Sequence, residues 1–322
     1  MKTTMVVLDG YTLNPGDNPW DDLEALGELT VYAHTPPEQV VERARGASIL
    51  LTNKTRLTAE LLAQLPDVAF VGVLATGYDV VDVAAASSRG IVVSNVPGYG
   101  DSAVAQHTMA LILGLCHRVE GHDSDVRRGV WTRAGHFCFW RSPPRELAGL
   151  TLGIVGLGNI GRRVGALGSA FGMSVLAWGG KSHGEPPFAP FAWAQSWEQL
   201  LAESDIITLH CPLNARSRGM INAQALRQMK SNAFLINTSR GELIDEHALA
   251  QALTQSVIGG AALDVLSTEP VQPGHPLLEA PRCIITPHMA WGSLAARQRL
   301  MRITVGNVQA FLNGSPIHTV GG

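Results

Sequence analysis

Three ionisable residues in the last third of the chain each follow an apolar, strand-like run. Arg240 lies in "INTSRGELID", Glu269 in "ALDVLSTEP" and His288 in "IITPHMAWGS". Arginine offers a planar cation that can hold a carboxylate and a neighbouring keto oxygen together. Histidine can donate and take back a proton near neutral pH, and a carboxylate beside it orients the ring and favours the imidazolium. The set fits proton transfer to the oxygen of a small carboxylate-bearing substrate.

A glycine-rich turn, "GLGNIG", stands between the strand-like run "TLGIV" and the helix-like run "NIGRRVGAL". Gly156 allows a tight turn, Gly158 lets the backbone approach a pyrophosphate, and Gly161 permits close packing of helix on strand. The following helix begins at Asn159 and Ile160, where free N–H groups attract an anion. This context predicts a dinucleotide site, and a purely structural turn is the alternative.

Alternating strand-like and helix-like runs position these residues. The first block has five apolar runs of strand length, "TTMVVLD", "LTVYA", "ASILLTN", "FVGVLA" and "IVVSNV". A longer helix over 101–118 and an aromatic, proline-rich loop over 129–149 lead to a second block with six such runs. The rhythm predicts an α/β protein with two doubly wound parallel sheets.

The last apolar run of the chain, over 293–314, is one long amphipathic helix without a strand of its own. We expect it to pack back on the first block, which predicts two domains. Residues 1–98 with 293–322 form the substrate-binding (catalytic) domain, and residues 99–292 form a Rossmann dinucleotide-binding domain. The cleft between the blocks is the expected active site.

Composition narrows the class of protein. The 322 residues are 46% hydrophobic and 16% charged, with a net charge of −3 and no dense Lys/Arg block, which argues against nucleic acid or an anionic membrane. The opening residues lack a signal peptide, and the most apolar helix-like run is too short for a bilayer. Four scattered cysteines and no metal-ligand spacing predict a cytoplasmic protein without a metal site.

The Arg–Glu–His order after the glycine turn resembles the D-isomer-specific 2-hydroxyacid dehydrogenase family. The segment "LATGYDVVDVAAASSRGIVVSNVPGYG" is similar to that family's substrate loop and domain crossing, and the resemblance covers essentially the whole chain. The runs "VVLDGYTLNPGD", "LTNKTRLT", "GVLATGYDVVD" and "FCFW" are most similar to its glycerate dehydrogenase, or hydroxypyruvate reductase, branch. The resemblance implies a flavodoxin-like substrate domain beside the Rossmann domain.

The resemblance also implies a role for each catalytic residue. His288 would be the acid/base, Glu269 its partner and Arg240 the substrate anchor. Lys54 ends another strand and could add a cation, although a solvated lysine is the alternative. Substrate-binding residues are then Lys54, Ala75, Thr76 and Gly77.

The same resemblance implies cofactor contacts beyond the glycine turn, and packing or turn chemistry is the alternative at each. Asp264 would hold the nicotinamide carboxamide, and the backbone after the strand "DIITLHC" would line the adenine. The implied residues are Thr108, Cys211, Pro212, Thr238, Ser239, Asp264 and Gly292. Trp291, which precedes Gly292, departs from the family pattern. Its ring could lie near the cleft, and packing at the domain interface is the alternative.

A second departure from the pattern concerns the choice of cofactor. An Asp or Glu usually ends the second strand of such folds and holds the ribose hydroxyls of NAD, whereas here Gly179 and Gly180 are followed by Lys181 and Ser182. An acid would repel a 2′-phosphate, while Lys181, Ser182 and the nearby Arg162 could bind one. NADP(H) is therefore favoured and NAD(H) possible, with a merely permissive site as the alternative.

The loop His136–Trp140, "HFCFW", is unusually aromatic for a connection. Aromatic residues anchor interfaces, and the resemblance implies dimers formed through the cofactor domain. We expect a homodimer with Phe139 and Trp140 at or near its interface, with local packing as the alternative.

The predicted function is an NAD(P)H-dependent reduction of hydroxypyruvate or glyoxylate to D-glycerate or glycolate. Two alternatives stay open. One is a dehydrogenase for another D-2-hydroxy acid or for phosphite on the same scaffold. The other is a dinucleotide-sensing, co-repressor-like protein that binds partner peptides.

Overall fold

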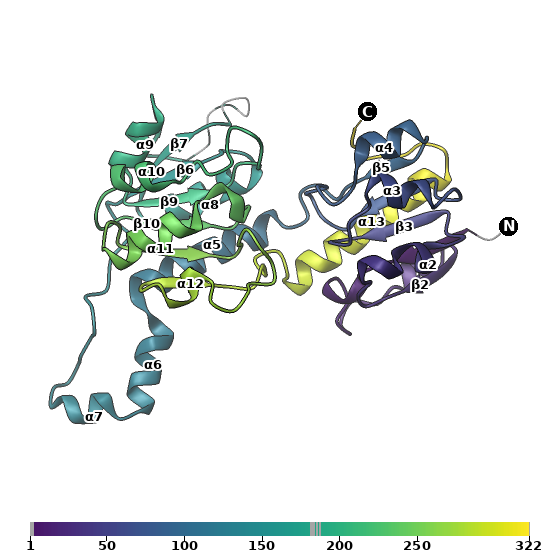
Figure 1. Cartoon of the computed structure of the whole chain (residues 1–322). Coiled ribbons are helices and arrows are strands. Elements are labelled where there is room, and N and C mark those ends of the chain that lie inside the picture. Colours follow the sequence, from purple (N-terminus) through teal and green to yellow (C-terminus); the bar gives the residue numbers. More distant parts are fainter. Residues whose placement is uncertain (1–2, 181–183, 185, 187, 322) are drawn as a thin grey trace. The chain divides into compact units, whose positions relative to one another are not determined.

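The computed structural model describes residues 3–180, 184, 186 and 188–321, and the chain divides into two compact units (Figure 1). Unit 1 holds the residues up to Gly100 and from Trp291 onward, and unit 2 holds Asp101–Ala290. The sequence predicts the domain boundaries two residues away from these, between 98 and 99 and between 292 and 293.

Unit 1 is built on a parallel sheet of five strands in the order β2-β1-β3-β4-β5, the flavodoxin-like order. All five predicted strands are present. Its elements are β1 (Thr4–Val7), η1 (Gly10–Thr12), α1 (Asp21–Glu24), β2 (Glu28–Val31), η2 (Pro37–Gln39), α2 (Val40–Ala44), β3 (Ile49–Thr52), α3 (Ala59–Ala63), β4 (Phe70–Val73), α4 (Val83–Ser88), β5 (Val92–Ser94) and α13 (Leu294–Leu312).

The inner strands β3 and β4 are buried on both faces, as their runs "ILLT" and "FVGV" indicate, while the edge strand β2 is largely exposed. The long helix α13 packs on this sheet, with Phe311 against Phe70 at a ring-centroid distance of 4.8 Å. Arg297 of the same helix is buried and forms an ion pair with Asp17. The last helix therefore belongs to the first block, as predicted from the absence of a strand beside it in the sequence.

Unit 2 is built on a parallel sheet of seven strands in the order β12-β11-β10-β9-β6-β7-β8. Buried clusters on both faces pack against the covering helices. Its elements are α5 (Asp101–His117), α6 (Val119–Arg127), α7 (Val130–Ala134), β6 (Thr151–Val155), α8 (Asn159–Ala170), β7 (Ser174–Trp178), β8 (Phe191–Trp193), α9 (Trp197–Glu203), β9 (Ile206–Leu209), α10 (Ala223–Gln228), β10 (Phe234–Asn237), η4 (Gly241–Leu243), α11 (Glu246–Thr254), β11 (Gly260–Leu263), α12 (Pro276–Glu279) and β12 (Cys283–Ile285).

The sheet of unit 2 confirms the Rossmann order, which changes direction at β6, with β7 on one side and β9 on the other. The expectation of six strands was wrong, because a seventh, β8, pairs with β7 at the edge. Its three residues, "FAW", follow a proline-rich stretch and are too short to give a clear strand pattern.

The segment between α5 and β6 also differs from expectation, since the predicted loop over 129–149 contains the helix α7. Together with α6 it forms a projection, residues 119–145, that extends away from the sheet of unit 2 (Figure 1). In the described part of the chain, no helix combines the length and apolar character that a membrane crossing needs.

Candidate active site

The glycine turn joins β6 to α8 at the point where the strand order reverses. Gly156 has a φ of +93°, and a Cβ there would lie 2.8 Å from the backbone of His210 and Cys211. A Cβ on Gly161 would lie 2.3 Å from the carbonyl oxygen of Gly156. Both positions therefore require glycine, which confirms the tight turn and the close helix–strand packing that the sequence predicted.

Gly158 differs from these two glycines, because a Cβ on it would meet nothing within 4 Å. The first turn of α8, which starts at Asn159 and Ile160, has no acidic side chain. Open space over the turn and uncompensated N–H groups at the start of a twelve-residue helix fit a pyrophosphate.

The end of β7 lies directly beside this turn. Gly156 N donates to Trp178 O at 2.8 Å, and Leu157 N donates to Gly179 O at 3.1 Å. Gly179 and Gly180 have φ values of +77° and +82°, and a Cβ on Gly180 would approach the Leu157 backbone to 2.8 Å. The paired glycines therefore place the end of this strand against the glycine turn.

Of the residues predicted to bind a 2′-phosphate, the structure describes Arg162. Lys181 and Ser182 lie outside the described residues. Arg162, on α8, donates from Nη1 to the carbonyl oxygen of Gly184 at 2.9 Å. This arginine therefore lies along the chain that follows Gly180.

His288 and Glu269 come from segments after neighbouring strands, β12 and β11, and the structure brings them together. His288 Nδ1 and Glu269 Oε2 are 2.6 Å apart. The other carboxylate oxygen, Oε1, accepts a hydrogen bond from the backbone of Leu266 at 3.1 Å. The contact with Glu269 thus orients the ring through Nδ1.

The backbone at His288 has a φ of +52°, a left-handed conformation that is uncommon outside glycine. Its N–H donates to Asp264 O at 2.8 Å, while the carboxylate of Asp264 accepts from Met289 N at 2.9 Å and from Ala290 N at 2.8 Å. These bonds hold the histidine in its strained conformation.

Asp264 is itself almost completely buried. Burial raises the pKa of its carboxyl, but hydrogen bonds from His107 and Thr286 and from two backbone amides outweigh burial and leave this pKa below its usual value. Thr286 Oγ1 donates to Asp264 Oδ1 at 2.6 Å, and His107 Nε2 lies 3.4 Å from the same oxygen. The residue predicted to hold the nicotinamide therefore also supports the segment that carries His288.

Arg240 follows β10 by three residues. Asn237 Nδ2 donates to the Arg240 carbonyl at 2.8 Å, and Asn237 Oδ1 accepts from Ser239 N at 3.0 Å. The guanidinium donates from Nη1 to Ser239 O at 2.9 Å. One buried amide therefore shapes the turn that presents the arginine.

Several residues predicted to contact the cofactor lie around the same turn. Ser239 Oγ donates to Cys211 O at 2.8 Å, which joins the ends of β10 and β9. Thr108 Oγ1 on α5 lies 3.1 Å from Thr238 Oγ1. Pro212 follows Cys211, and its carbonyl accepts from Ser217 at 2.8 Å. The structure thus gathers these five predicted residues at the carboxyl edge of the sheet.

Unit 1 holds the predicted substrate-binding residues. Lys54 is exposed after β3, and the carboxylate of Asp9 accepts hydrogen bonds from Asn53 N at 2.7 Å and Lys54 N at 2.6 Å. Asp9 is buried at the end of β1, so it fixes the turn that carries the lysine.

The loop of Ala75, Thr76 and Gly77 follows β4 in the same way. Thr76 Oγ1 donates to Val96 O at 2.9 Å, and Asn95 Nδ2 donates to Thr76 O at 2.7 Å. The chain after β5 therefore holds this loop from two sides.

Gly292 was predicted in the dinucleotide domain, but it belongs to unit 1, where its carbonyl accepts from Arg297 at 3.0 Å. Trp291 packs edge-on against Tyr99 with a centroid distance of 6.2 Å. The turn before α13 is thus part of the packing of unit 1.

Sequence reasoning missed the residues that support the site. Asp9, Asn237 and His107 bind no predicted ligand, yet each holds a segment that carries a predicted site residue. Asp9 and Asn237 lie at strand ends of a parallel sheet, which is the one signal that could have singled them out.

His210, between β9 and Cys211, is a further residue that was missed. Its Nε2 atom is buried and has no hydrogen-bond partner within the described residues. Burial lowers the pKa of its imidazole from 6.5 to about 3, so the ring is neutral. The backbone of His210 adjoins Gly156 of the glycine turn, and a buried polar atom without a partner among the described residues is a feature that a bound ligand would explain.

A Rossmann sheet with a glycine turn at its switch point, and an arginine and a Glu–His pair on segments that follow later strands, is typical of a dinucleotide-dependent oxidoreductase. Comparison with known proteins gives the family. Residues 109–290 match the NAD binding domain of the D-isomer specific 2-hydroxyacid dehydrogenases. Over 319 residues the chain is 44% identical to a hydroxypyruvate reductase of Blautia hydrogenotrophica, covering 98% of this chain and 99% of that one.

Two further relatives agree with this assignment. A glycerate dehydrogenase of Methylorubrum extorquens is 42% identical over 286 residues, or 88% of each chain. The crystal structure of an NADPH-dependent glyoxylate/hydroxypyruvate reductase from Sinorhizobium meliloti, in complex with NADP and malonate, superposes with a TM-score of 0.84 at 27% identity, covering 100% of this chain and 97% of that one. The protein belongs to the D-isomer specific 2-hydroxyacid dehydrogenase family, and within it resembles the glycerate dehydrogenases.

Proposed function

We propose that the protein reduces small 2-keto acids, with hydroxypyruvate and glyoxylate as its substrates and D-glycerate and glycolate as the products. The observation that carries the proposal is the 2.6 Å contact between His288 Nδ1 and Glu269 Oε2, on segments that follow neighbouring strands. The relatives named above, which are reductases or dehydrogenases of these acids, support the choice of substrate.

In the proposed reaction, His288 Nε2 gives a proton to the keto oxygen, and Glu269 stabilises the imidazolium before the transfer. Arg240 binds the substrate carboxylate and polarises the keto group. Lys54 and the N–H groups of the loop 75–77 are further proposed contacts for the carboxylate. A nicotinamide dinucleotide held by the glycine turn 156–161 would supply the hydride to the substrate carbon.

Purified protein with NADPH or NADH and a panel of keto acids tests this proposal through the loss of absorbance of the reduced cofactor. Hydroxypyruvate and glyoxylate should be reduced with the highest kcat/KM. Preference for a bulkier keto acid, or NAD(P)⁺ reduction by phosphite, would instead favour the alternative dehydrogenase. Activity that survives replacement of both Arg240 and His288 by alanine would refute the mechanism.

We also propose that NADPH is preferred over NADH. Support comes from Gly179 and Gly180, which follow β7 and carry no carboxylate at these two positions beside the glycine turn, and from Arg162, which donates to the carbonyl oxygen of Gly184. In Gly179→Asp we expect the NADPH:NADH ratio of kcat/KM to fall at least about tenfold, because the new carboxylate repels a 2′-phosphate. Aspartate tolerates the φ of +77° at this position better than most residues do. Equal efficiency with both cofactors, unchanged in this variant, would contradict the preference.

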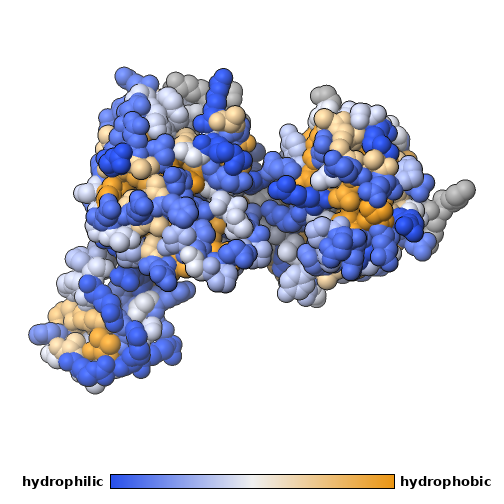
Figure 2. All heavy atoms as spheres, in the orientation of Figure 1, coloured by the Kyte–Doolittle hydropathy of each residue, from blue (hydrophilic) through white to orange (hydrophobic). Residues whose placement is uncertain are grey.

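The proposed assembly is a homodimer formed through the projection 119–145. Trp131, Phe137 and Trp140 are 45%, 90% and 56% exposed there, and Figure 2 shows apolar surface on this part of the molecule. Phe139 is half-buried against His122, with ring centroids 6.2 Å apart. Large exposed aromatic side chains of this kind are typical of an interface.

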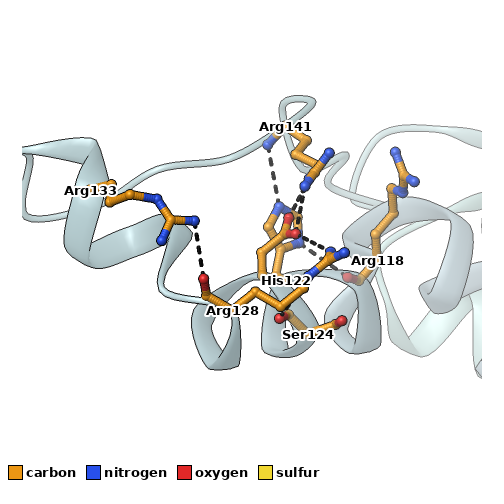
Figure 3. Close-up of polar contacts among 7 residues, drawn as sticks. Arg118, His122, Ser124, Arg128, Arg133 and Arg141 are labelled. Atoms are coloured by element: carbon orange, nitrogen blue, oxygen red, sulfur yellow. Dashed lines mark hydrogen bonds and ion pairs between the residues drawn. The ribbon is translucent and has the colours of Figure 1, made fainter.

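Hydrogen bonds hold the projection in a defined shape (Figure 3). Buried Asp125 accepts from Arg128 at 2.6 Å and from both Nε and Nη2 of Arg141, which ties the returning chain to α6. Light scattering should give the mass of a dimer at micromolar concentration, and Phe137→Ser with Trp140→Ser should give a monomer. A monomeric mass for the wild type would refute the dimer. The cytoplasmic location stays a prediction from the sequence.

A further inference from the structure

The segment between β11 and α12 carries Glu269, and one buried carboxylate holds it at two points. Glu246, in the first turn of α11, accepts a hydrogen bond from Ser267 N at 2.7 Å and another from Ser267 Oγ. It also accepts from His275 Nε2 at 3.1 Å. Ser267 and His275 stand on either side of Glu269, so this carboxylate closes the loop 267–275 at its base.

The bonds of His275 show why it is a donor to Glu246. Its Nδ1 accepts from Leu277 N at 3.4 Å, as the N-cap of α12. The hydrogen is therefore on Nε2, which points to Glu246. One imidazole thus connects the start of α12 to the start of α11.

A second contact joins the same loop to the substrate anchor. Gly241 follows Arg240 directly, and a Cβ on Gly241 would lie 1.9 Å from the carbonyl carbon of Leu266 and 2.2 Å from Ser267 N. The backbone after Arg240 therefore packs directly on the first residues of the loop. The short segment 240–246 carries Arg240 at one end and Glu246 at the other.

We propose that Glu246, with Ser267 and His275, is a positioning group that sets Glu269 against His288 and keeps both in register with Arg240. Glu246 is buried, and its carboxylate is bonded to Ser267 and His275. It acts by holding the loop 267–275, in which Glu269 orients the imidazole of His288. The kinetic part of this inference rests on the proposed reduction of keto acids.

A spectroscopic test separates the inference from the proposed function. The short His288–Glu269 hydrogen bond should give a downfield proton resonance, which is assigned by its loss in His288→Gln and in Glu269→Gln. This signal requires no turnover. If it behaves as expected while no keto acid is reduced, the proposed function fails and the positioning role stands.

The decisive variants separate the two bonds of His275. Asparagine at 275 can place an oxygen where Nδ1 caps α12 but has no atom at Nε2, whereas glutamine can place a donor near Nε2 but does not cap. We expect the downfield signal to be lost and kcat to fall about tenfold in His275→Asn and in Glu246→Ala, with the Kd for NADPH unchanged. His275→Gln should keep both the signal and most of kcat. Glu242→Gln, in the same segment and 4.0 Å from Arg218, is the matched control and should resemble the wild type.

The inference is overturned if His275→Asn keeps the signal and a kcat within about twofold of the wild type. It is also overturned if His275→Asn and His275→Gln lose both to the same extent, because the donor to Glu246 that His275→Gln retains would then not be what holds the loop. Should Glu246→Ala fail to fold, the two variants at 275 still decide.

Discussion

Replacing Gly241 by alanine tests how closely the Arg240 and Glu269 segments must fit. The added Cβ would lie 1.9 Å from the carbonyl carbon of Leu266. An ordinary contact between carbon atoms is about 3.5 Å, so the two segments must separate by roughly 1.6 Å. The contact atoms in Leu266 and Ser267 are backbone atoms, so no change of rotamer can relieve the clash.

The size of the effect follows from this displacement. Overpacking of this kind costs about 1–3 kcal/mol, which lowers the Tm by roughly 2–12 °C for a unit of this size. The effect on catalysis should be larger, because a misplacement of about 1 Å can cost a factor of 10² in rate. We therefore expect kcat for hydroxypyruvate to fall about a hundredfold in Gly241→Ala.

Steady-state kinetics with hydroxypyruvate and NADPH, together with thermal unfolding, measure both effects. Gly306→Ala is the control, since a Cβ at this position in α13 would meet nothing within 4 Å. The control should keep full activity and unfold at the same or a slightly higher temperature. If Gly241→Ala keeps kcat within about twofold of the wild type, the close fit of the two segments does not matter for catalysis and the reasoning fails.

Three further predictions follow from single contacts. Asn95→Ala removes the hydrogen bond from Asn95 Nδ2 to Thr76 O at 2.7 Å. In steady-state assays the KM for hydroxypyruvate should rise several-fold, while the Kd for NADPH stays the same. An unchanged KM would show that this bond does not support the substrate loop. Hydrogen bonds from Arg141, and to a smaller extent from Arg128, lower the pKa of the Asp125 carboxyl from 3.8 to about 2. Their stabilisation of the projection is therefore complete above pH 3.8 and is lost as the pH falls toward 2; proteolysis by pepsin should cut the projection increasingly over that range, and cutting that is independent of pH would contradict this. Burial raises the pKa of the Cys283 thiol to about 12, so iodoacetamide at pH 8 should leave this thiol unmodified in the folded protein. Mass spectrometry measures the modification, and a rate as fast as that in urea would contradict this.

Much of the fold could be predicted because its signals are local. Strands buried on both faces, such as β3 and β4, read as unbroken apolar runs. The amphipathic period of α13 predicted a long helix, and the absence of a strand beside it in the sequence predicted its return to the first block. The edge strand β8 and the helix α7 were missed, since three and five residues carry too little periodicity to be recognised.

The candidate site was predictable at the residues that end strands. Arg240, Glu269 and His288 could be singled out from their type and from the run before them, and the glycines of the turn from their spacing. Nothing in the sequence indicated Glu246, which is an ordinary acidic residue in the first turn of a helix. Its three hydrogen bonds reach residues 21 and 29 positions away, and their partners depend on how two loops pack.

The amino-acid order was enough to determine the alternating elements, the order of the two blocks and the residues that can do chemistry, because these depend on neighbours within a few positions. The tertiary structure alone decided the 2.6 Å contact of His288 with Glu269, the left-handed backbone at His288 and the closure of the Glu269 loop by Glu246. Hydrogen-bond geometry at that level is set to a few tenths of an ångström. Only the packing of loops from separate strands can supply it.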